Sequence, residues 1–286
     1  MKNYNYVIIT SVKDEEDVIE KTIESVVQQT TLPKEWLIVD DNSVDSTLEI
    51  VKKYSKQYEW IKYCKNTKIT TEEKGARIAS IINTYLQSIE FKEYDFFSKL
   101  DGDLLLPEDF FEKVISHFKL DPKLGIASGS LIYEGKKEKN IYEDLTRGAT
   151  KFYRRECYLD IGGLQLTTGW DTIDNIIAQN KGWKTKVLDV WFDHLEEEGA
   201  SQGFVKKYYN VGRYCGKIPY HSWYFLLKLI YRITDKPYVI STLILTYGYI
   251  KTRFIKRERP FPREVTKYFR NKQQKLLIEG IKSYLS

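Results

Sequence analysis

The chain has 286 residues, enough for one large domain or for one domain with an appendage, and its 22 tyrosines and 14% aromatic content exclude a disordered protein. Its three cysteines are scattered without a Cys-x-x-Cys or Cys/His cluster, which excludes a zinc site and a disulfide framework and predicts a reducing, cytoplasmic setting. The net charge of +5 is uneven: Lys251 to Ser286 carries eleven Lys and Arg against three Glu, or +8, which leaves −3 for the remainder. No nucleic-acid-binding motif accompanies this basic end, so nucleic acid is not an expected partner.

The first half of the chain alternates short apolar runs with stretches of helical spacing. Strands are predicted at 6–11, 36–39, 60–64 and 94–100, and helices at 18–29, 48–54, 73–88 and 107–118. This alternation favours a parallel sheet with right-handed crossovers. No signal peptide is expected, because the first strand begins almost at the N-terminus. The absence of GxGxxG after that strand, and of GxxxxGK[ST] anywhere, argues against a dinucleotide dehydrogenase and a P-loop NTPase.

The apolar run from Tyr94 to Leu100 ends in two carboxylates, Asp101 and Asp103, with only Gly102 between them. Ligands bind at the carboxyl ends of strands in open α/β sheets. Two carboxylates one residue apart, on a turn that glycine makes permissive, suit a hard divalent cation such as Mg²⁺ or Mn²⁺, which can hold a diphosphate. The alternative is an ordinary acidic turn before the helix that Pro107 is predicted to open.

The second half of the catalytic region has a less regular pattern. Strands are predicted at 124–133 and 185–192, with an exposed charged loop at 134–140 and a loop at 196–203 that could close over a ligand. A helix with an apolar stripe follows Thr168 and ends at Gly182, which places Asp171 and Asp174 in its first turn. The last of these strands ends in Asp193 and His194.

The C-terminal region predicts helices. One covers 204–213, after which Gly212 and Gly216 are expected to loosen the chain, and two apolar helices at 223–233 and 238–250 form a hairpin. The second apolar stretch is too short to span a bilayer. The hairpin is therefore expected to lie on a membrane surface or to form an oligomer contact, with packing against the catalytic domain as the alternative. The basic tail favours the membrane surface, so the protein would be cytoplasmic and peripheral on the inner face of the membrane.

Three segments together resemble the inverting family 2 glycosyltransferases of GT-A fold. They are Ile8-Ile-Thr-Ser-Val-Lys-Asp-Glu-Glu16, Val39-Asp-Asp-Asn-Ser-Val-Asp-Ser-Thr47 and Lys99-Leu-Asp-Gly-Asp103, in the family's order and spacing. The resemblance covers about Asn5 to Leu195, although Val12-Lys13-Asp14 stands where the family usually has Pro-x-Asn. It implies an α/β GT-A domain over 1–200, with a mostly parallel central sheet flanked by helices, and a helical, basic extension over 201–286.

The resemblance also implies a nucleotide-sugar site. The implied donor contacts are Thr10, Asp41, Lys74, Gly75, Arg77 and Asp101. A carboxylate at Asp41 can accept the N3–H of uracil, and a helix N-terminus with Arg77 suits a diphosphate. On the residues alone, Asp41 is equally a turn or cap acid, and Arg77 equally part of a solvated helix face.

A general base and a third metal ligand are implied as well. Counted back from Gly182, Asp171 matches the family's catalytic aspartate, but Trp170 stands where Glu is usual, so Asp174 is the alternative. An inverting transferase needs such a base because the acceptor hydroxyl loses its proton as it attacks. On the residues alone the two acids could simply cap the helix. His194 would join Asp101 and Asp103 as a metal ligand, and imidazole suits Mn²⁺ better than Mg²⁺; otherwise it is a hydrogen-bonded surface histidine.

The expected function is therefore metal-dependent sugar transfer from a UDP-sugar to a hydroxyl of a glycan or lipid-linked acceptor in surface polysaccharide assembly. One alternative enzyme is a polyprenyl-phosphate sugar synthase, whose nucleophile is already an anion and would not need Asp171. Outside enzymes, the alternative is a nucleotide-sugar-binding scaffold. A scaffold needs no base, so the set of Asp101, Asp103 and Asp171 favours an enzyme.

Overall fold

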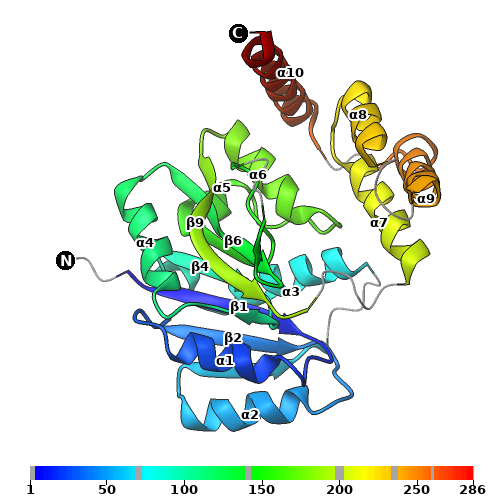
Figure 1. The fold of residues 1–286 in the computed structure, drawn as a ribbon. Coiled ribbons are helices and arrows are strands. Elements are labelled where there is room, and N and C mark those ends of the chain that lie inside the picture. Colours follow the sequence, from blue (N-terminus) through cyan, green and yellow to red (C-terminus); the bar gives the residue numbers. More distant parts are fainter. Residues whose placement is uncertain are drawn as a thin grey trace. The chain divides into compact units, whose positions relative to one another are not determined.

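The computed structural model describes residues 4–67, 73–138, 143–196, 203–232, 238–258 and 261–285. The chain divides into two compact units, Met1–Glu197 (unit 1) and Glu198–Ser286 (unit 2). Unit 1 is a sheet flanked by helices and unit 2 is helical (Figure 1). None of the helices in the described segments has the length and apolar character that crossing a membrane requires.

Unit 1 has a nine-stranded sheet, in the order β3-β2-β1-β4-β8-β6-β9-β5 with β7 beside β6. Its strands are β1 (Tyr6–Val12), β2 (Glu35–Asp40), β3 (Ile61–Lys65), β4 (Phe96–Leu100), β5 (Leu104–Leu105), β6 (Leu124–Tyr133), β7 (Lys136–Lys137), β8 (Thr150–Arg154) and β9 (Lys184–His194). Its helices are α1 (Ile19–Val27), α2 (Thr47–Gln57), α3 (Lys74–Ser88), the 3₁₀ turn η1 (Phe91–Glu93), α4 (Phe110–Leu120), α5 (Arg155–Asp160) and α6 (Trp170–Asn180).

The first four major strands are parallel, as their sequence predicts. Strands β1, β2 and β4 are almost continuous buried runs, which suits a sheet covered on both faces, whereas β3 at the edge of the sheet is buried only at Ile61. Side chains such as those of Ile8 and Trp36 pack in one core with α1, α2 and α4. Side chains of opposite parity, such as Val7 and Ile9, pack in the second core with α3, α5 and α6. The carboxyl ends of these strands therefore meet at one edge of the sheet.

The second half of the sheet contains antiparallel pairings. Strand β8 is inserted between β4 and β6 and runs antiparallel to both, whereas β6 and β9 are parallel. The β4–β8 register places Lys99 directly opposite Lys151. Strand β9 then returns to pair with β5, Leu104 facing His194. The site residues at the end of β4 thus acquire neighbours from β8 and β9.

Several helix boundaries differ from the sequence prediction, and the contacts explain two of the differences. Helix α4 begins at Phe110 rather than Pro107, because the Pro107 carbonyl accepts hydrogen bonds from Phe110 N (3.0 Å) and from Gln29 Nε2 (2.7 Å) in a turn before the helix. Helix α7 (Phe204–Lys217) continues through Gly212 and Gly216, which were expected to loosen it.

Unit 2 is built from helices around one close crossing. After α7 come α8 (Ser222–Arg232), α9 (Tyr238–Ile250), the π-helical turn η2 (Lys251–Ile255) and α10 (Arg263–Leu285). A Cβ at Gly212 would lie 2.1 Å from Leu245 O, and one at Gly248 would lie 2.5 Å from Tyr209 O. These glycines let α7 and α9 approach backbone to backbone, so their role is packing rather than flexibility.

Candidate active site

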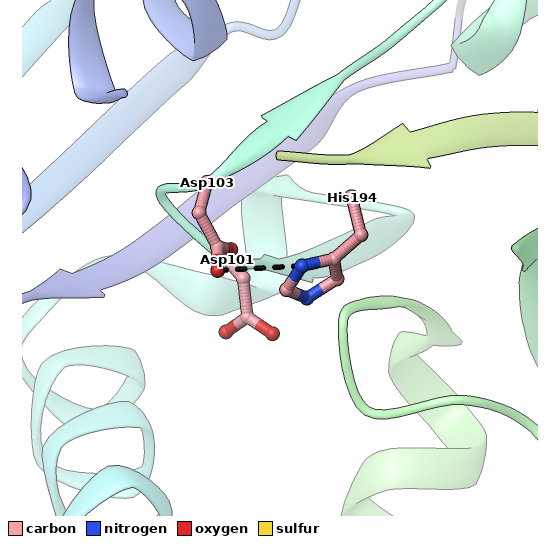
Figure 2. A group of neighbouring side chains, drawn as sticks. All are labelled: Asp101, Asp103 and His194. Atoms are coloured by element: carbon pink, nitrogen blue, oxygen red, sulfur yellow. Dashed lines mark ion pairs between the residues drawn. The ribbon is translucent and has the colours of Figure 1, made fainter. Parts of the chain in front are cut away.

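Two carboxylates and an imidazole converge at the carboxyl end of β4. Asp101 follows that strand, Asp103 precedes β5, and His194 ends β9 (Figure 2). One ligand atom from each lies within 4.8 Å of the others, and His194 Nδ1 lies 3.5 Å from Asp103 Oδ2. Leu195 N donates to Asp103 O over 2.8 Å, which holds the end of β9 beside the aspartates. The structure thus brings together all three residues of the predicted metal site.

The turn between the aspartates is held by side chains of the N-terminal segments. Thr22 Oγ1 donates to the Gly102 carbonyl (2.7 Å) and accepts from Leu104 N (2.9 Å). A Cβ at residue 102 would lie 2.0 Å from Glu15 Oε2 and 2.8 Å from Val12 Cγ1. Gly102 is therefore required for space, since its φ is not in the left-handed region. The sequence predicts a glycine here for its backbone freedom, whereas the structure requires it because a side chain would not fit.

Gly102→Ala is expected to damage the metal site. The Glu15 carboxylate can swing away, but Val12 is 1% exposed inside β1, so the turn must move instead. We expect a loss of about 1–3 kcal/mol in the free energy of unfolding, as for other overpacked sites, together with weaker Mn²⁺ binding. Urea unfolding and calorimetric titration with Mn²⁺ measure the two effects.

Gly203→Ala is the matched control, because a Cβ there meets nothing within 4 Å. Its effect should stay within about 0.5 kcal/mol. Mn²⁺ affinity equal to that of the unmodified chain in Gly102→Ala would show that the turn does not set the ligand geometry.

The electrostatics of the cluster fit a divalent cation. Burial, together with the neighbouring Asp101 carboxylate, raises the pKa of Asp103 to about 6. Lys99 forms an ion pair with Asp101 and is itself only 3% exposed. Two adjacent carboxylates are disfavoured as a charged pair in such a place unless a cation neutralises them. Oxygen and imidazole donors together suit Mn²⁺ or Mg²⁺, with Mn²⁺ favoured by the imidazole.

The imidazole of His194 is oriented by the backbone. Its Nδ1 lies 2.6 Å from Glu196 O, a contact that favours the tautomer with the proton on Nδ1. In that tautomer Nε2 carries the lone pair, which is how a carbonyl usually orients a metal-binding histidine. The loop predicted at 196–203 lies, apart from its first and last residues, outside the described residues.

Asp41 and Arg77, two of the predicted donor contacts, form an ion pair. Arg77 Nε lies 3.1 Å from Asp41 Oδ2, and Asn66 Nδ2 donates to Asp41 Oδ1 over 2.7 Å. Asn66 was missed, although it directly follows β3 and so obeys the same strand-end rule that selected Asp41 and Asp101. Thr10, by contrast, is fully buried with its Oγ1 accepting from Trp36 Nε1 (2.9 Å), so the structure does not bring it to the surface of the site.

The start of α3 contacts the segment before α6. A Cβ at Gly75 would lie 2.8 Å from Thr168 Cα, and the Glu73 carboxylate accepts from Thr168 N. The structure therefore gives Gly75 a packing reason that is independent of any donor. Lys74 is the first residue of α3; the structure describes its backbone but not its side chain.

Two consecutive residues, Gly148 and Ala149, link Asp171 to the metal cluster. Gly148 packs against Asp171, since a Cβ at Gly148 would be 3.2 Å from Asp171 Oδ2. The next residue, Ala149, accepts a hydrogen bond from Asp101 N (3.0 Å). The segment 148–149 therefore connects the predicted base with the predicted metal ligand.

Asp174, the alternative base, is buried and held by other side chains. It is 1% exposed and pairs with Lys151 Nζ (2.6 Å to Oδ2), while Tyr153 Oη also donates to it. Burial raises its pKa to about 6, against the attraction of Lys151. A carboxylate enclosed in this way is poorly placed to meet an acceptor, so the geometry favours Asp171.

Sequence reasoning missed the buried lysines of β4 and β8. Lys151 is completely buried and also donates to the backbone carbonyl of Asp171. Lys99 and Lys151 both lie over the ring of Trp170, with Nζ 5.9 and 5.5 Å from the ring centroid. Trp170, in place of the family's usual Glu, is thus a core residue that shields two cations. A lysine within a buried apolar run was the available signal.

The departure at Val12-Lys13-Asp14 does not disturb the loop. Asp14 has φ +54, a left-handed conformation that both Asp and Asn tolerate, and its Oδ1 accepts from Val44 N (2.8 Å). An aspartate can therefore replace the family's usual asparagine here.

The sheet order, the flanking helices and an Asp-x-Asp turn at the strand ends define a GT-A-type fold. Residues 7–170 match the family described as "Glycosyl transferase family 2". The chain belongs to this family.

Two solved structures and a group of curated relatives extend the comparison. A mannosyltransferase from Pyrobaculum calidifontis, PcManGT in complex with GDP-Man and Mn²⁺, aligns with a TM-score of 0.62 over 89% of each chain at 15% identity. A form of Staphylococcus aureus TarS in complex with UDP-GlcNAc aligns with a TM-score of 0.55 at 17% identity, over 88% of this chain and 73% of that one. These similarities establish the fold.

Poly-beta-1,6-N-acetyl-D-glucosamine synthase of Staphylococcus aureus is 31% identical over 117 residues, which are 41% of this chain and 26% of the relative. The same synthase from Staphylococcus epidermidis is 27% identical over 117 residues. The chain therefore matches about a quarter of the length of these relatives.

Proposed function

We propose that the protein is a metal-dependent, inverting glycosyltransferase. It takes the sugar of a UDP-sugar and transfers it to a hydroxyl of a glycan or lipid-linked acceptor, in the assembly of a surface polysaccharide. The observation that carries this proposal is the convergence of Asp101, Asp103 and His194 at the strand ends, with Asp171 connected to them through residues 148–149. The similarity to a polysaccharide synthase and to structures with GDP-Man and UDP-GlcNAc supports the substrate class.

Each residue of the candidate active site would have a separate role in the reaction. Asp171 would accept the proton of the acceptor hydroxyl as that oxygen forms its bond to the anomeric carbon. The bond between the anomeric carbon and the diphosphate breaks on the opposite face of the sugar, so the configuration inverts in one displacement. Asp101, Asp103 and His194 would hold Mn²⁺ or Mg²⁺, which when bound supplies positive charge for the leaving diphosphate. Lys99 keeps the Asp101 carboxylate in place through its ion pair.

The nucleobase would meet the Asp41–Arg77 pair. A carboxylate there can accept the N3–H of uracil, and Asn66 fixes its orientation. The related structures hold GDP-Man in one case and UDP-GlcNAc in the other, so the fold accommodates both bases. Because a carboxylate can accept the N1–H of guanine as well, the donor test below includes both bases.

Donor hydrolysis without acceptor tests the proposal. UDP-GlcNAc, UDP-glucose, UDP-galactose and GDP-mannose are each incubated with Mn²⁺, with Mg²⁺ or with chelator, and nucleotide release is measured. We expect slow, metal-dependent release of UDP from one donor. In His194→Ala the Mn²⁺ concentration for half-maximal rate should rise by roughly tenfold or more, and the effect with Mg²⁺ should be smaller because imidazole favours Mn²⁺.

His117→Ala is the control, because His117 lies on α4 outside the metal cluster. If no donor is hydrolysed and no nucleotide binds in a metal-dependent manner, the assignment of Asp101 and Asp103 is wrong. If a nucleotide-sugar binds without hydrolysis, the donor site stands, and transfer to an acceptor then decides between the enzyme and the scaffold alternative.

A further inference from the structure

The exposed side of α9 is apolar. Five of its large side chains are between 44% and 63% exposed, and they are Val239, Ile240, Leu243, Tyr247 and Ile250. At about 100° per residue these positions fall within roughly a 100° arc of the helix. The opposite side packs inward, where Leu245 and Tyr249 are 0% and 6% exposed. A helix that is apolar on its inner and its outer side is unusual for a surface in water.

Helix α8, which packs beside α9, also has apolar residues on both its buried and its exposed side. Its buried Phe225 stacks on Tyr249 with ring centroids 3.5 Å apart, which fixes the two helices against each other. Leu226, Leu227 and Ile230 lie on the exposed side of α8, at 51% to 63% exposure. Together with the five residues of α9 they form the apolar faces of α8 and α9.

Strong positive charge accompanies these apolar faces. Residues 198–286 contain eighteen Lys and Arg against five Asp and Glu, or +13, which leaves −8 for unit 1. Helix α9 itself contains no charged residue, and Lys251 follows it directly. The Lys251 ammonium lies over the rings of Tyr209 and Tyr247, 5.7 and 5.6 Å from their centroids. Aromatic rings and lysines beside an apolar surface are typical of segments at a lipid–water interface.

An anionic lipid surface fits this combination better than a protein partner does. A second copy of the chain would bring another unit of +13 against the first. Unit 1 is acidic, but within its described segments the exposed large apolar side chains do not gather on one helix: they are Leu32, Val44, Tyr63, Leu105, Leu120, Leu159 and Leu166. Helix α9 has 13 residues, or about 20 Å, against the ~30 Å of a bilayer core, so it suits burial parallel to the surface.

We propose that the apolar faces of α8 and α9 bind the surface of a membrane that contains anionic lipids. The apolar side chains enter the boundary between headgroups and acyl chains, and the surrounding lysines and arginines meet the negative headgroups. This binding does not depend on the proposed transfer reaction.

Vesicle flotation with the full chain tests the proposal. The unmodified protein should float with phosphatidylcholine vesicles that contain phosphatidylglycerol, and much less with phosphatidylcholine alone. The double variant Ile240→Gln/Leu243→Gln should partition roughly tenfold less or worse, because it removes apolar groups without changing the charge. Lys256→Gln/Arg257→Gln should weaken binding to the anionic vesicles and reduce its salt dependence.

The matched control is Leu120→Gln/Leu159→Gln, which makes the same chemical change at two exposed positions of unit 1, 83% and 60% exposed. It should float like the unmodified chain. Circular dichroism verifies that each variant is folded, and substitutions at exposed positions should leave it so. The proposal is overturned if the unmodified chain does not float, if the α9 variant floats equally well, or if phosphatidylcholine alone suffices. It is also overturned if sedimentation without lipid shows a dimer that the α9 variant dissociates, since a second copy would then be the occupant.

Discussion

Asp171→Asn should lower turnover by about 10²- to 10⁴-fold while donor binding is retained, the range expected when a general base is removed. The amide is nearly the same size as the carboxylate, and the Lys151 contact is made to the backbone carbonyl of Asp171, so the local structure should survive. Donor hydrolysis gives the turnover, and calorimetric titration with the donor gives the affinity. A loss of turnover without a loss of affinity assigns Asp171 to the chemical step.

Asp189→Asn is the matched control, because Asp189 is an exposed carboxylate on β9 and should tolerate the change. Unchanged turnover in Asp171→Asn would remove this residue from the mechanism. Transfer to a polyprenyl phosphate that is insensitive to Asp171→Asn would favour the lipid-phosphate alternative, whose acceptor is already an anion.

The parallel half of the sheet was predictable because each strand carries its own signal. The runs that became β1, β2 and β4 are mostly apolar and almost wholly buried, and polar residues that the sheet does not need for packing follow them. The same rule identified Asp41, Asp101 and Asp103, and it would also have identified Asn66 after β3. Local pattern suffices here because strand and ligand position are adjacent in the sequence.

The remaining parts of the site depend on contacts between distant segments. Nothing in the sequence around residue 151 shows that β8 will pair antiparallel with β4 and place Lys151 opposite Lys99. The contacts that link Asp171 to the metal cluster, through Gly148 and Ala149, likewise arise from the pairing of distant segments. In unit 2, Gly212 looks like a helix breaker until the close approach of α9 is known. Each of these features is set by tertiary packing, which overrides local propensity.

Lys151→Met should destabilise unit 1 by about 3–5 kcal/mol, because it leaves the Asp174 carboxylate buried without its cation. Lys151 is 0% and Asp174 1% exposed, so water cannot replace the missing partner. The loss should appear as a lower urea midpoint. The fraction that remains folded should also turn over more slowly at unchanged donor affinity, since Lys151 holds the first turn of α6 through the Asp171 carbonyl.

A second substitution separates the buried charge from a simple packing defect. In Lys151→Met/Asp174→Leu both charges are gone, so much of the lost stability should return, as for other buried pairs replaced together. Tyr153 then loses its acceptor, which should keep the recovery incomplete. Lys62→Met, at an exposed position of β3, should change stability by no more than about 0.5 kcal/mol. If Lys151→Met is as stable as the unmodified chain, Asp174 is held as a neutral acid. The Lys151 ammonium would then contribute to turnover, through its contact with the Asp171 carbonyl, and not to the stability of the fold.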